Sequence, residues 1–316
     1  MSTKRVCSWK GRSDMRAQQD YIVNMLNQKI DLTNRVPLRA KETVEIPPSA
    51  FDERHDTVLY WLGGGGFLMN SRGTIVMVDP VIEMDRDTMT SETGHKMLIP
   101  FPISANRVDH VDCVLYTHPD LDHVGPTTSR ILARKRVRRL APQRVALNLL
   151  EHGVKLDDIT TCRKGDHHQV NDVRIEVIEA DHPWQLIDRE KHGKPLRGDD
   201  ACGFVVRTPD GTFLFTGDTR LLESHLDISD VDVILVDTAK CAFHLNVEGA
   251  IILCSAYPSA FLIPYHYGVF DEPTIPAQEQ GNPEDVFRCV PNADRRAVGL
   301  APGEPFILEN RSQKTI

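Results

Sequence analysis

The sequence predicts an α/β fold in which helices cover the outer faces of two β-sheets. Short runs rich in β-branched and aromatic residues recur in both halves of the chain, and helix-like stretches lie between them. The chain has 316 residues, of which 41% are hydrophobic and 26% are charged, a composition typical of a globular protein with a substantial core. Because no linker clearly divides residues 50–310, we expect an N-terminal extension over 1–50 and one domain over 51–316.

Three predicted strands open the domain. They cover residues 57–63 (TVLYWLG), 67–71 (FLMNS) and 74–80 (TIVMVDP). The glycine run 63–66 and the sequence Ser71-Arg72-Gly73 separate them, which favours a meander. The glycine run lacks the Lys-Ser/Thr ending of a phosphate loop and precedes a strand, so it predicts a turn. Within the extension, residues 15–32 carry a weak helical pattern.

Residues 81–108 form a long polar segment without a clear period, and connections of this length are usually functional or mobile, so a lid is one hypothesis. Alternating elements follow. The predicted strands are 111–117, a segment around Leu140, 173–180, 203–208, 212–218, 231–237 and 260–265, and the predicted helices are 127–135, 143–152 and 248–256.

Charge and composition exclude several classes of protein. The net charge is −8, so nucleic acid is a poor default partner. No apolar run approaches the roughly 20 residues that span a bilayer, and the N-terminus lacks the apolar centre of a secretion signal, so we expect a cytoplasmic protein without a membrane partner. The seven cysteines are scattered and include no C-x-x-C pair, which argues against a disulfide scaffold or a cysteine zinc cluster.

One dense basic run covers residues 134–139 (RKRVRR). It has no interleaved aromatic residues, so we interpret it as a solvated helix end and strand start outside the site, with binding of an anion or of another subunit as the alternative. We expect a small-molecule substrate, and homo-oligomer formation stays open.

The most informative segment is THPDLDH at residues 117–123, because it follows an apolar strand and carries four potential metal ligands in six residues. Imidazole and carboxylate groups together bind divalent zinc, manganese or iron. The alternative is a solvated polar turn in which an Asp caps the following helix. Three further strands end in a similar way, in ADH at 180–182, FTGDT at 215–219 and IPYHYG at 263–268.

The pattern His-x-Asp-x-Asp-His resembles the His-x-His-x-Asp-His motif of the metallo-β-lactamase fold superfamily, and the later His, Gly-Asp and His follow in that family's order. The resemblance covers residues 57–310 and implies a four-layer αββα sandwich. It is nearest to the branch that contains L-ascorbate-6-phosphate lactonase. The segments that indicate this branch are YWLG at 60–63, TH at 117–118, GDD at 198–200, IPYHY at 263–267 and LAPGE at 300–304.

The resemblance implies two divalent metal ions per subunit, zinc or manganese, with iron as a further option. It places His118, Asp120 and His182 around one ion, and Asp122, His123 and His266 around the other, with Asp218 bridging them. Asp120 stands where the family most often has histidine. A carboxylate favours harder ions, and losing an imidazole leaves open that only the second site is filled.

Other polar residues have weaker assignments. Asp79 resembles an Asp that steadies the motif loop. His244 resembles a position near the pocket of some relatives, with a capping or surface role as the alternative, and adjacent His167 and His168 cannot both be ligands because neighbouring strand residues point to opposite faces. The remaining histidines are expected to face solvent; they are His55, His95, His110, His152, His192 and His225.

This ligand set predicts a metal-dependent hydrolase. Two bridged ions lower the pKa of a water from about 15.7 toward 7 and provide a metal-bound hydroxide, and Asp122 is the residue expected to orient that water or accept its proton. The resemblance favours a small polar ester, above all a lactone. A phosphodiesterase acting on a small phosphodiester or nucleotide is the alternative, and a non-catalytic metal-binding protein is the alternative of another class.

Overall fold

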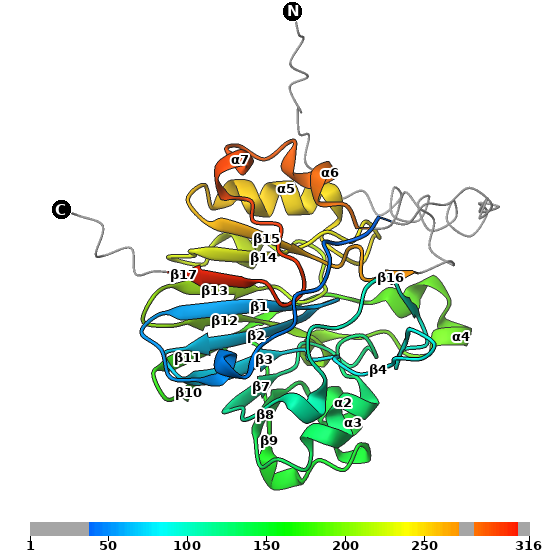
Figure 1. Ribbon diagram of the computed structural model, residues 1–316. Coiled ribbons are helices and arrows are strands. Elements are labelled where there is room, and N and C mark those ends of the chain that lie inside the picture. The colour runs from blue at the N-terminus through cyan, green and yellow to red at the C-terminus, as the bar shows by residue number, and fades with distance from the viewer. Residues whose placement is uncertain (1–37, 272–280, 309–316) are drawn as a thin grey trace, which may run out of the picture.

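The computed structural model describes residues 38–271 and 281–308, and in it the chain forms two stacked β-sheets between two layers of helices (Figure 1). The four-layer αββα arrangement expected from the sequence is therefore confirmed. The helical pattern at 15–32 lies outside the described residues. Within the described ranges, no helix is both long and apolar enough to cross a membrane.

The first sheet has seven strands, and β1, β2 and β3 form the predicted meander at its centre. In sheet order the strands are β17 (Pro305–Leu308), β1 (Thr57–Gly63), β2 (Gly66–Ser71), β3 (Thr74–Val78), β7 (Cys113–Leu115), β8 (Arg138–Ala141) and β9 (Ile159–Thr161). Arg72 and Gly73, with φ of 53° and 91°, close the β2–β3 hairpin. Positive φ at both central residues is what a type I′ turn needs, which explains the glycine there.

The second sheet has six strands and supplies the other half of the core. In sheet order they are β10 (His167–Val170), β11 (Val173–Glu179), β12 (Cys202–Arg207), β13 (Thr212–Phe215), β14 (Val233–Asp237) and β15 (Phe261–Tyr265). The pairs from β10 to β13 are antiparallel, whereas β13, β14 and β15 are parallel. The carboxyl ends of these parallel strands therefore lie at one edge of the sheet, where polar side chains can meet.

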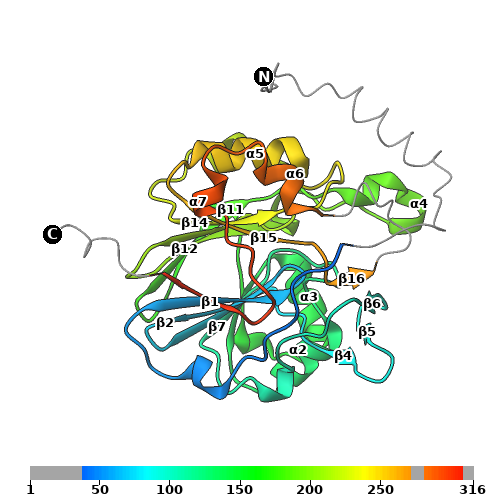
Figure 2. The same ribbon diagram turned by 45° about the horizontal axis from the view of Figure 1, so that its top comes forward.

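Helices cover the outer faces of both sheets, as Figures 1 and 2 show. Those on the first sheet are α2 (Pro126–Leu132) and α3 (Gln143–Glu151), and those on the second are α5 (Asn246–Ala256), α6 (Pro283–Phe287) and α7 (Ala293–Arg296). The short α4 (Arg189–His192) lies in the connection between β11 and β12. Pro126 starts α2 at a position where its missing N–H costs nothing.

The central strands are buried on both faces, which is why strand sequences such as TVLYWLG are almost wholly apolar. Leu59, Phe67, Phe204 and Phe213 belong to the core between the sheets. Alternate residues face outward, and Val58 packs in the cluster that includes α2 and α3. The alternation of side chains along each strand thus fills three apolar layers.

The polar segment 81–108 forms a small third sheet that the sequence does not predict. Its strands, in sheet order, are β16 (Phe270–Asp271), β6 (Lys96–Met97), β5 (Thr90–Ser91) and β4 (Met84–Asp85). The pairing of β16 with β6 joins this segment to the chain that follows β15. It therefore reaches the same end of the molecule as the predicted ligands.

The described part of the N-terminal extension lies against the domain. Ala40 N–H donates to Gly268 O at 3.0 Å and Ile46 N–H to Pro102 O at 3.1 Å, and both side chains are buried. The domain boundary at residue 51 stays a prediction, but residues 38–50 share the cores of the domain.

Two side chains expected to be exposed to solvent are buried. Arg139 in the basic run is fully buried and donates to the carbonyl oxygens of Val137 and Leu132, because a guanidinium with backbone acceptors can be buried without a carboxylate partner. His225 is also fully buried, since its Nε2 lies 2.9 Å from Glu179 O and its Nδ1 accepts the Leu222 N–H. Local sequence cannot reveal such backbone partners.

Candidate metal centre

The loop 117–123 follows β7 and carries four predicted ligands. His118 and His123 are buried, whereas Asp120 and Asp122 are half-buried. The carbonyl oxygen of Asp120 accepts the N–H groups of His123 and Val124 at 2.9 and 2.8 Å, which closes a tight turn. Because of this turn, both imidazoles reach the carboxylate of Asp218.

The first group of predicted ligands is brought together as expected. Asp120 Oδ2 lies 3.3 Å from His118 Nε2 and 3.4 Å from His182 Nε2. Candidate ligand atoms of these three residues all lie within 4.8 Å of one another. Since His182 follows β11, two separate strand ends build this group.

The second group is also brought together. His123 Nε2 lies 3.8 Å from Asp122 Oδ2, and His266, which follows β15, places Nδ1 at 3.5 Å from Asp218 Oδ1. Candidate ligand atoms of Asp122, His123, His266 and Asp218 form one cluster. Each group therefore offers two imidazoles and one carboxylate of its own.

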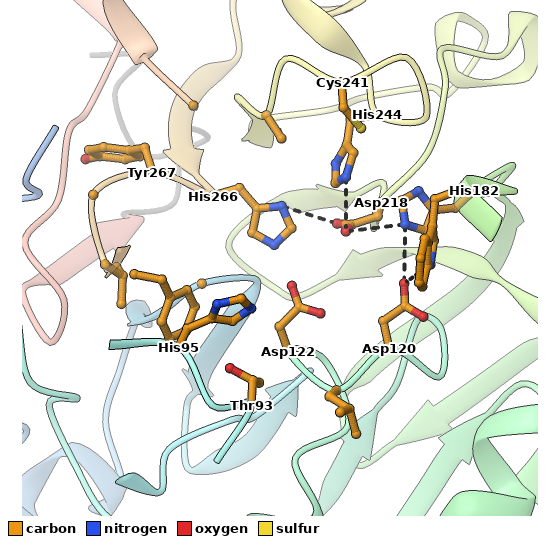
Figure 3. A pocket seen from close by; sticks show the side chains of 18 of the residues that line it. Thr93, His95, Asp120, Asp122, His182, Asp218, Cys241, His244, His266 and Tyr267 are labelled. Carbon is orange, nitrogen blue, oxygen red and sulfur yellow. Dashed lines mark hydrogen bonds and ion pairs between the residues drawn. The ribbon is translucent and has the colours of Figure 1, made fainter. Parts of the chain in front are cut away.

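Asp218 lies between the two groups, at the end of β13. Its Oδ2 is 3.7 Å from His118 Nε2 and 3.2 Å from His123 Nε2. Figure 3 shows Asp120, Asp122, His182, Asp218 and His266 pointing into one pocket. This is the place that a bridging carboxylate requires.

The residues fit a divalent metal centre on chemical grounds. Within the described residues, the buried atoms His118 Nε2, His123 Nε2, His266 Nε2 and Asp218 Oδ1 have no hydrogen-bond partner. Burying polar atoms without hydrogen-bond partners costs free energy. A cluster of such atoms therefore indicates a site that binds a ligand. Neutral imidazole nitrogens and carboxylate oxygens are the donors that zinc, manganese and iron accept.

Asp79 holds the motif loop, as its predicted role requires. Its Oδ1 accepts the Thr117 N–H at 2.8 Å, and its Oδ2 accepts the Thr117 hydroxyl and lies 2.8 Å from His123 Nδ1. A carboxylate at Nδ1 leaves Nε2 of the same ring free to face a metal. Asp79 and His266 both adopt left-handed backbone, with φ of 42° and 57°, a strained conformation that is concentrated at functional sites.

Two further contacts orient the first group. His182 Nδ1 lies 2.8 Å from Phe243 O, which directs its Nε2 toward Asp120. Trp184 Nε1–H donates to Asp120 Oδ2 at 2.7 Å, so the indole fixes the carboxylate that replaces the family's usual histidine.

His244 and Asp237 form a pair at the rim of the cluster. His244 Nδ1 lies 2.6 Å from Asp237 Oδ2, and His244 Nε2 lies 3.8 Å from Asp218 Oδ2. Asp237 ends β14 and also lies 3.3 Å from His266 Nδ1. His244 lines the pocket, in agreement with its predicted position near substrate, and this contact does not test whether it binds substrate.

Neighbouring imidazoles keep the carboxylates of Asp218 and Asp237 ionised. Burial acts to raise the pKa of Asp218, but the neighbouring His123, His266 and His244 outweigh it and hold that pKa well below its usual range. Burial also acts on Asp237, where His244 and His266 prevail and lower the pKa to about 2. For His182, burial is the main effect and lowers the pKa, which favours the neutral ring that binds metals.

Sequence reasoning missed three residues of this region. Asp237 ends the apolar run 231–237, and that strand-end position is the signal that could have found it. Trp184 follows His182 by two positions but has no motif of its own. His95, expected to face solvent, instead lines the pocket because the small third sheet brings it there (Figure 3).

This chain is similar to proteins of known family and to proteins of known structure. A model described as "Beta-lactamase superfamily domain" matches residues 74–267. A UPF0173 metal-dependent hydrolase of Solibacter usitatus is 22% identical over 253 residues, which cover 78% of this chain and 97% of that protein. Another, from Nitratidesulfovibrio vulgaris, is 26% identical over 277 residues, covering 82% and 98%.

Solved structures share the fold at low identity. A possible metal-dependent hydrolase from Veillonella parvula has a TM-score of 0.63 at 15% identity, covering 80% of this chain and all of that one. Igni18, a metallo hydrolase from Ignicoccus hospitalis, has a TM-score of 0.58 at 18% identity, covering 81% and 99%. With the family model spanning more than half of its residues, this chain belongs to the beta-lactamase superfamily, whose metallo-β-lactamase fold it has and whose matched relatives are named metal-dependent hydrolases.

Proposed function

We propose that this protein is a metal-dependent hydrolase with two divalent ions per chain. One ion is held by His118, Asp120 and His182, the other by Asp122, His123 and His266, and Asp218 bridges them. The observation that carries the proposal is the position of Asp218 between two groups of buried imidazoles, in which the Nε2 atoms of His118, His123 and His266 have no hydrogen-bond partner among the described residues. When bound, such ions supply Lewis acidity and lower the pKa of water.

Side chains of this protein have separate tasks in the proposed reaction. Asp122 has a side chain that is 41% exposed, so its carboxylate faces the pocket and is the group we assign to orient the attacking water and accept its proton. Asp79 and Trp184 position His123 and Asp120. His244, steadied by Asp237, is the residue at the rim that we expect to contact substrate.

We propose a lactone as the substrate, in keeping with the resemblance to the L-ascorbate-6-phosphate lactonase branch. A phosphodiester carries a charge that commonly requires a lysine or arginine beside the metal ions. None of the described residues that line the pocket is a lysine or an arginine, which favours the lactone. The half-exposed Asp122 beside the cluster disfavours a non-catalytic metal-binding protein, because such a protein needs no carboxylate to accept a proton from water.

The donor set also favours one kind of ion. Asp120 brings the carboxylates of the centre to three, and oxygen donors favour harder ions such as manganese or iron over zinc. The indole N–H of Trp184 orients Asp120 toward His118 and His182, so both sites are expected to fill. We also propose a cytoplasmic location. The division into an N-terminal extension over residues 1–50 and a domain over residues 51–316 is a proposal as well.

Reconstitution tests the proposed function. Protein stripped with EDTA and reloaded with manganese or zinc is assayed on γ-butyrolactone and on bis(4-nitrophenyl) phosphate. We expect metal-dependent turnover of the lactone, and a fall in kcat/KM of at least ~100-fold in both Asp218→Ala and His266→Ala, since each removes a direct ligand. Turnover of the phosphodiester alone would exclude the lactonase, and full activity of both variants would exclude metal-dependent hydrolysis.

A further inference from the structure

The pocket beside the metal centre has features that restrict the substrate further. Its volume is about 560 Å³, within the range of roughly 300–1,000 Å³ typical of small-molecule sites. The predicted ligands Asp120, Asp122 and Asp218 line it, together with two groups of apolar and aromatic side chains. These apolar and aromatic side chains are not predicted metal ligands. Their chemistry therefore indicates which groups the substrate carries beyond the bond that is hydrolysed.

Among the described residues, no lysine or arginine lines the pocket where an anionic substituent would lie. Lys240, between two lining residues, has its Nζ 2.6 Å from Asp285 Oδ2, and Arg220 donates to Asp181 Oδ2 at 2.9 Å through Nε. A carboxylate or phosphate held away from the metal ions would therefore be desolvated without a lysine or arginine as its counter-charge.

One wall is apolar and open to solvent. Leu121, Trp184 and Ile187 line it, and Leu121 is 52% exposed although it lies inside the motif loop. The Trp184 ring is held by its hydrogen bond to Asp120 and by a ring contact with His192 at 4.7 Å. Exposed apolar groups gathered at a concave site are a recognised mark of ligand binding.

A second wall of the pocket is aromatic, and other contacts hold its rings in place. Tyr267 stacks on Trp61 with ring centroids 5.1 Å apart, and Phe270 packs edge-on against Phe101 at 6.1 Å. Figure 3 shows Tyr267 on the far side of His266 from Asp218. Because Trp184, Tyr267 and Phe270 are held by other contacts, an apolar substituent binds to these rings without the cost of ordering them.

From these contacts we infer that the substrate is an uncharged lactone or ester with an apolar substituent, which packs against Leu121, Trp184 and Ile187. The inference rests on the proposed hydrolase function and narrows it. It departs from the expectation of a small polar ester, and from a phosphorylated sugar lactone in particular.

A lactone series measures this preference in the manganese-loaded protein. The probes are γ-butyrolactone, γ-nonalactone with its five-carbon tail, and the anionic 5-oxotetrahydrofuran-2-carboxylate. Each fully buried methylene is worth a factor of about four, so we expect kcat/KM to be at least ~10-fold higher for γ-nonalactone than for γ-butyrolactone. The anionic lactone should be the poorest of the three. Equal rates for the two neutral lactones, or a preference for the anionic one, would overturn the inference.

A binding measurement separates this inference from the proposed reaction. Calorimetry compares 5-pentyl-2-pyrrolidinone, a lactam that resists hydrolysis, with unsubstituted 2-pyrrolidinone. Binding at least ~10-fold tighter for the pentyl compound supports the apolar wall even if no lactone is hydrolysed, in which case only the proposed function fails. If lactones are hydrolysed but the pentyl group adds nothing, the inference fails and the hydrolase stands.

Two substitutions locate the wall. Ile187→Lys places a cation at the half-exposed edge of the pocket, and should abolish the preference for the pentyl lactam while improving binding of the anionic lactone. Leu156→Lys is the matched control, because Leu156 is 69% exposed and does not line the pocket. An unchanged preference in Ile187→Lys would contradict the assignment of this wall.

Discussion

Gly65 is the position at which the smallest change should damage the metal centre. A Cβ at this residue would lie 2.4 Å from His123 Cε1 and 3.0 Å from Nδ1, whereas ordinary contact begins at 3.4 Å. His123 cannot retreat freely, since it is 1% exposed and its Nδ1 is 2.8 Å from Asp79 Oδ2. Gly65→Ala should therefore displace the ring by up to about 1 Å.

That displacement gives the expected magnitudes. Overpacking of a buried site costs about 1–3 kcal/mol of unfolding free energy. A displaced ligand should weaken metal binding by ~10–100-fold, the loss typical when the support of a ligand is removed. Urea unfolding and calorimetric titration with manganese measure the two effects.

Gly299→Ala is the control for this substitution. A Cβ there would meet no atom within 4 Å, and the residue is not among those with positive φ, so metal binding should be unchanged. If Gly65→Ala binds manganese as tightly as the wild type, the packing of the glycine turn on His123 does not set the geometry of the centre.

Three further predictions concern other residues. Asp79→Asn should lower metal affinity by ~10–100-fold with the fold retained, measured by calorimetry and circular dichroism, because the contact at His123 Nδ1 changes; unaltered affinity would contradict it. Trp184→Phe removes the N–H on Asp120 but keeps an aromatic ring, so affinity at the first site should fall by ~10–100-fold, the value of one hydrogen bond to a charged group; equal affinity would refute this role. Burial lowers the pKa of His225, so its neutral form contributes stability that is present above about pH 6.5 and lost as pH falls through the folded pKa. His225→Gln should flatten the dependence of unfolding free energy on pH between 7 and 5 in urea titrations, and an unchanged slope would show that other groups cause it.

Much of the fold could be predicted because its strands are buried on both faces. Runs such as 74–80 and 231–237 are mostly apolar, and the aspartates near their ends, Asp79 and Asp237, mark the edge where the site forms. His118, His123, His182 and His266 could be proposed in the same way, because they follow the ends of the predicted strands 111–117, 173–180 and 260–265. Their convergence on Asp218 follows from the sheet order, which the resemblance supplied and which local periodicity cannot supply.

The remainder depends on contacts between distant segments. The short strands of 81–108 have no apolar period, since each pairs over about two residues, and so the sequence predicted only a polar segment. The hydrogen bond from Trp184 to Asp120 spans 64 positions, and the burial of His225 depends on the carbonyl of Glu179, 46 positions away. Such pairs are fixed by tertiary packing and carry no local pattern.

The number of metal ions bound by wild-type protein and by Asp218→Ala tests the central claim most directly. Equilibrium dialysis against manganese, followed by elemental analysis, should find two ions per wild-type chain and fewer than one in Asp218→Ala, because the bridging carboxylate serves both groups. Two ions in Asp218→Ala, or none in the wild type, would contradict the assignment of Asp218 as the bridge of a dinuclear centre.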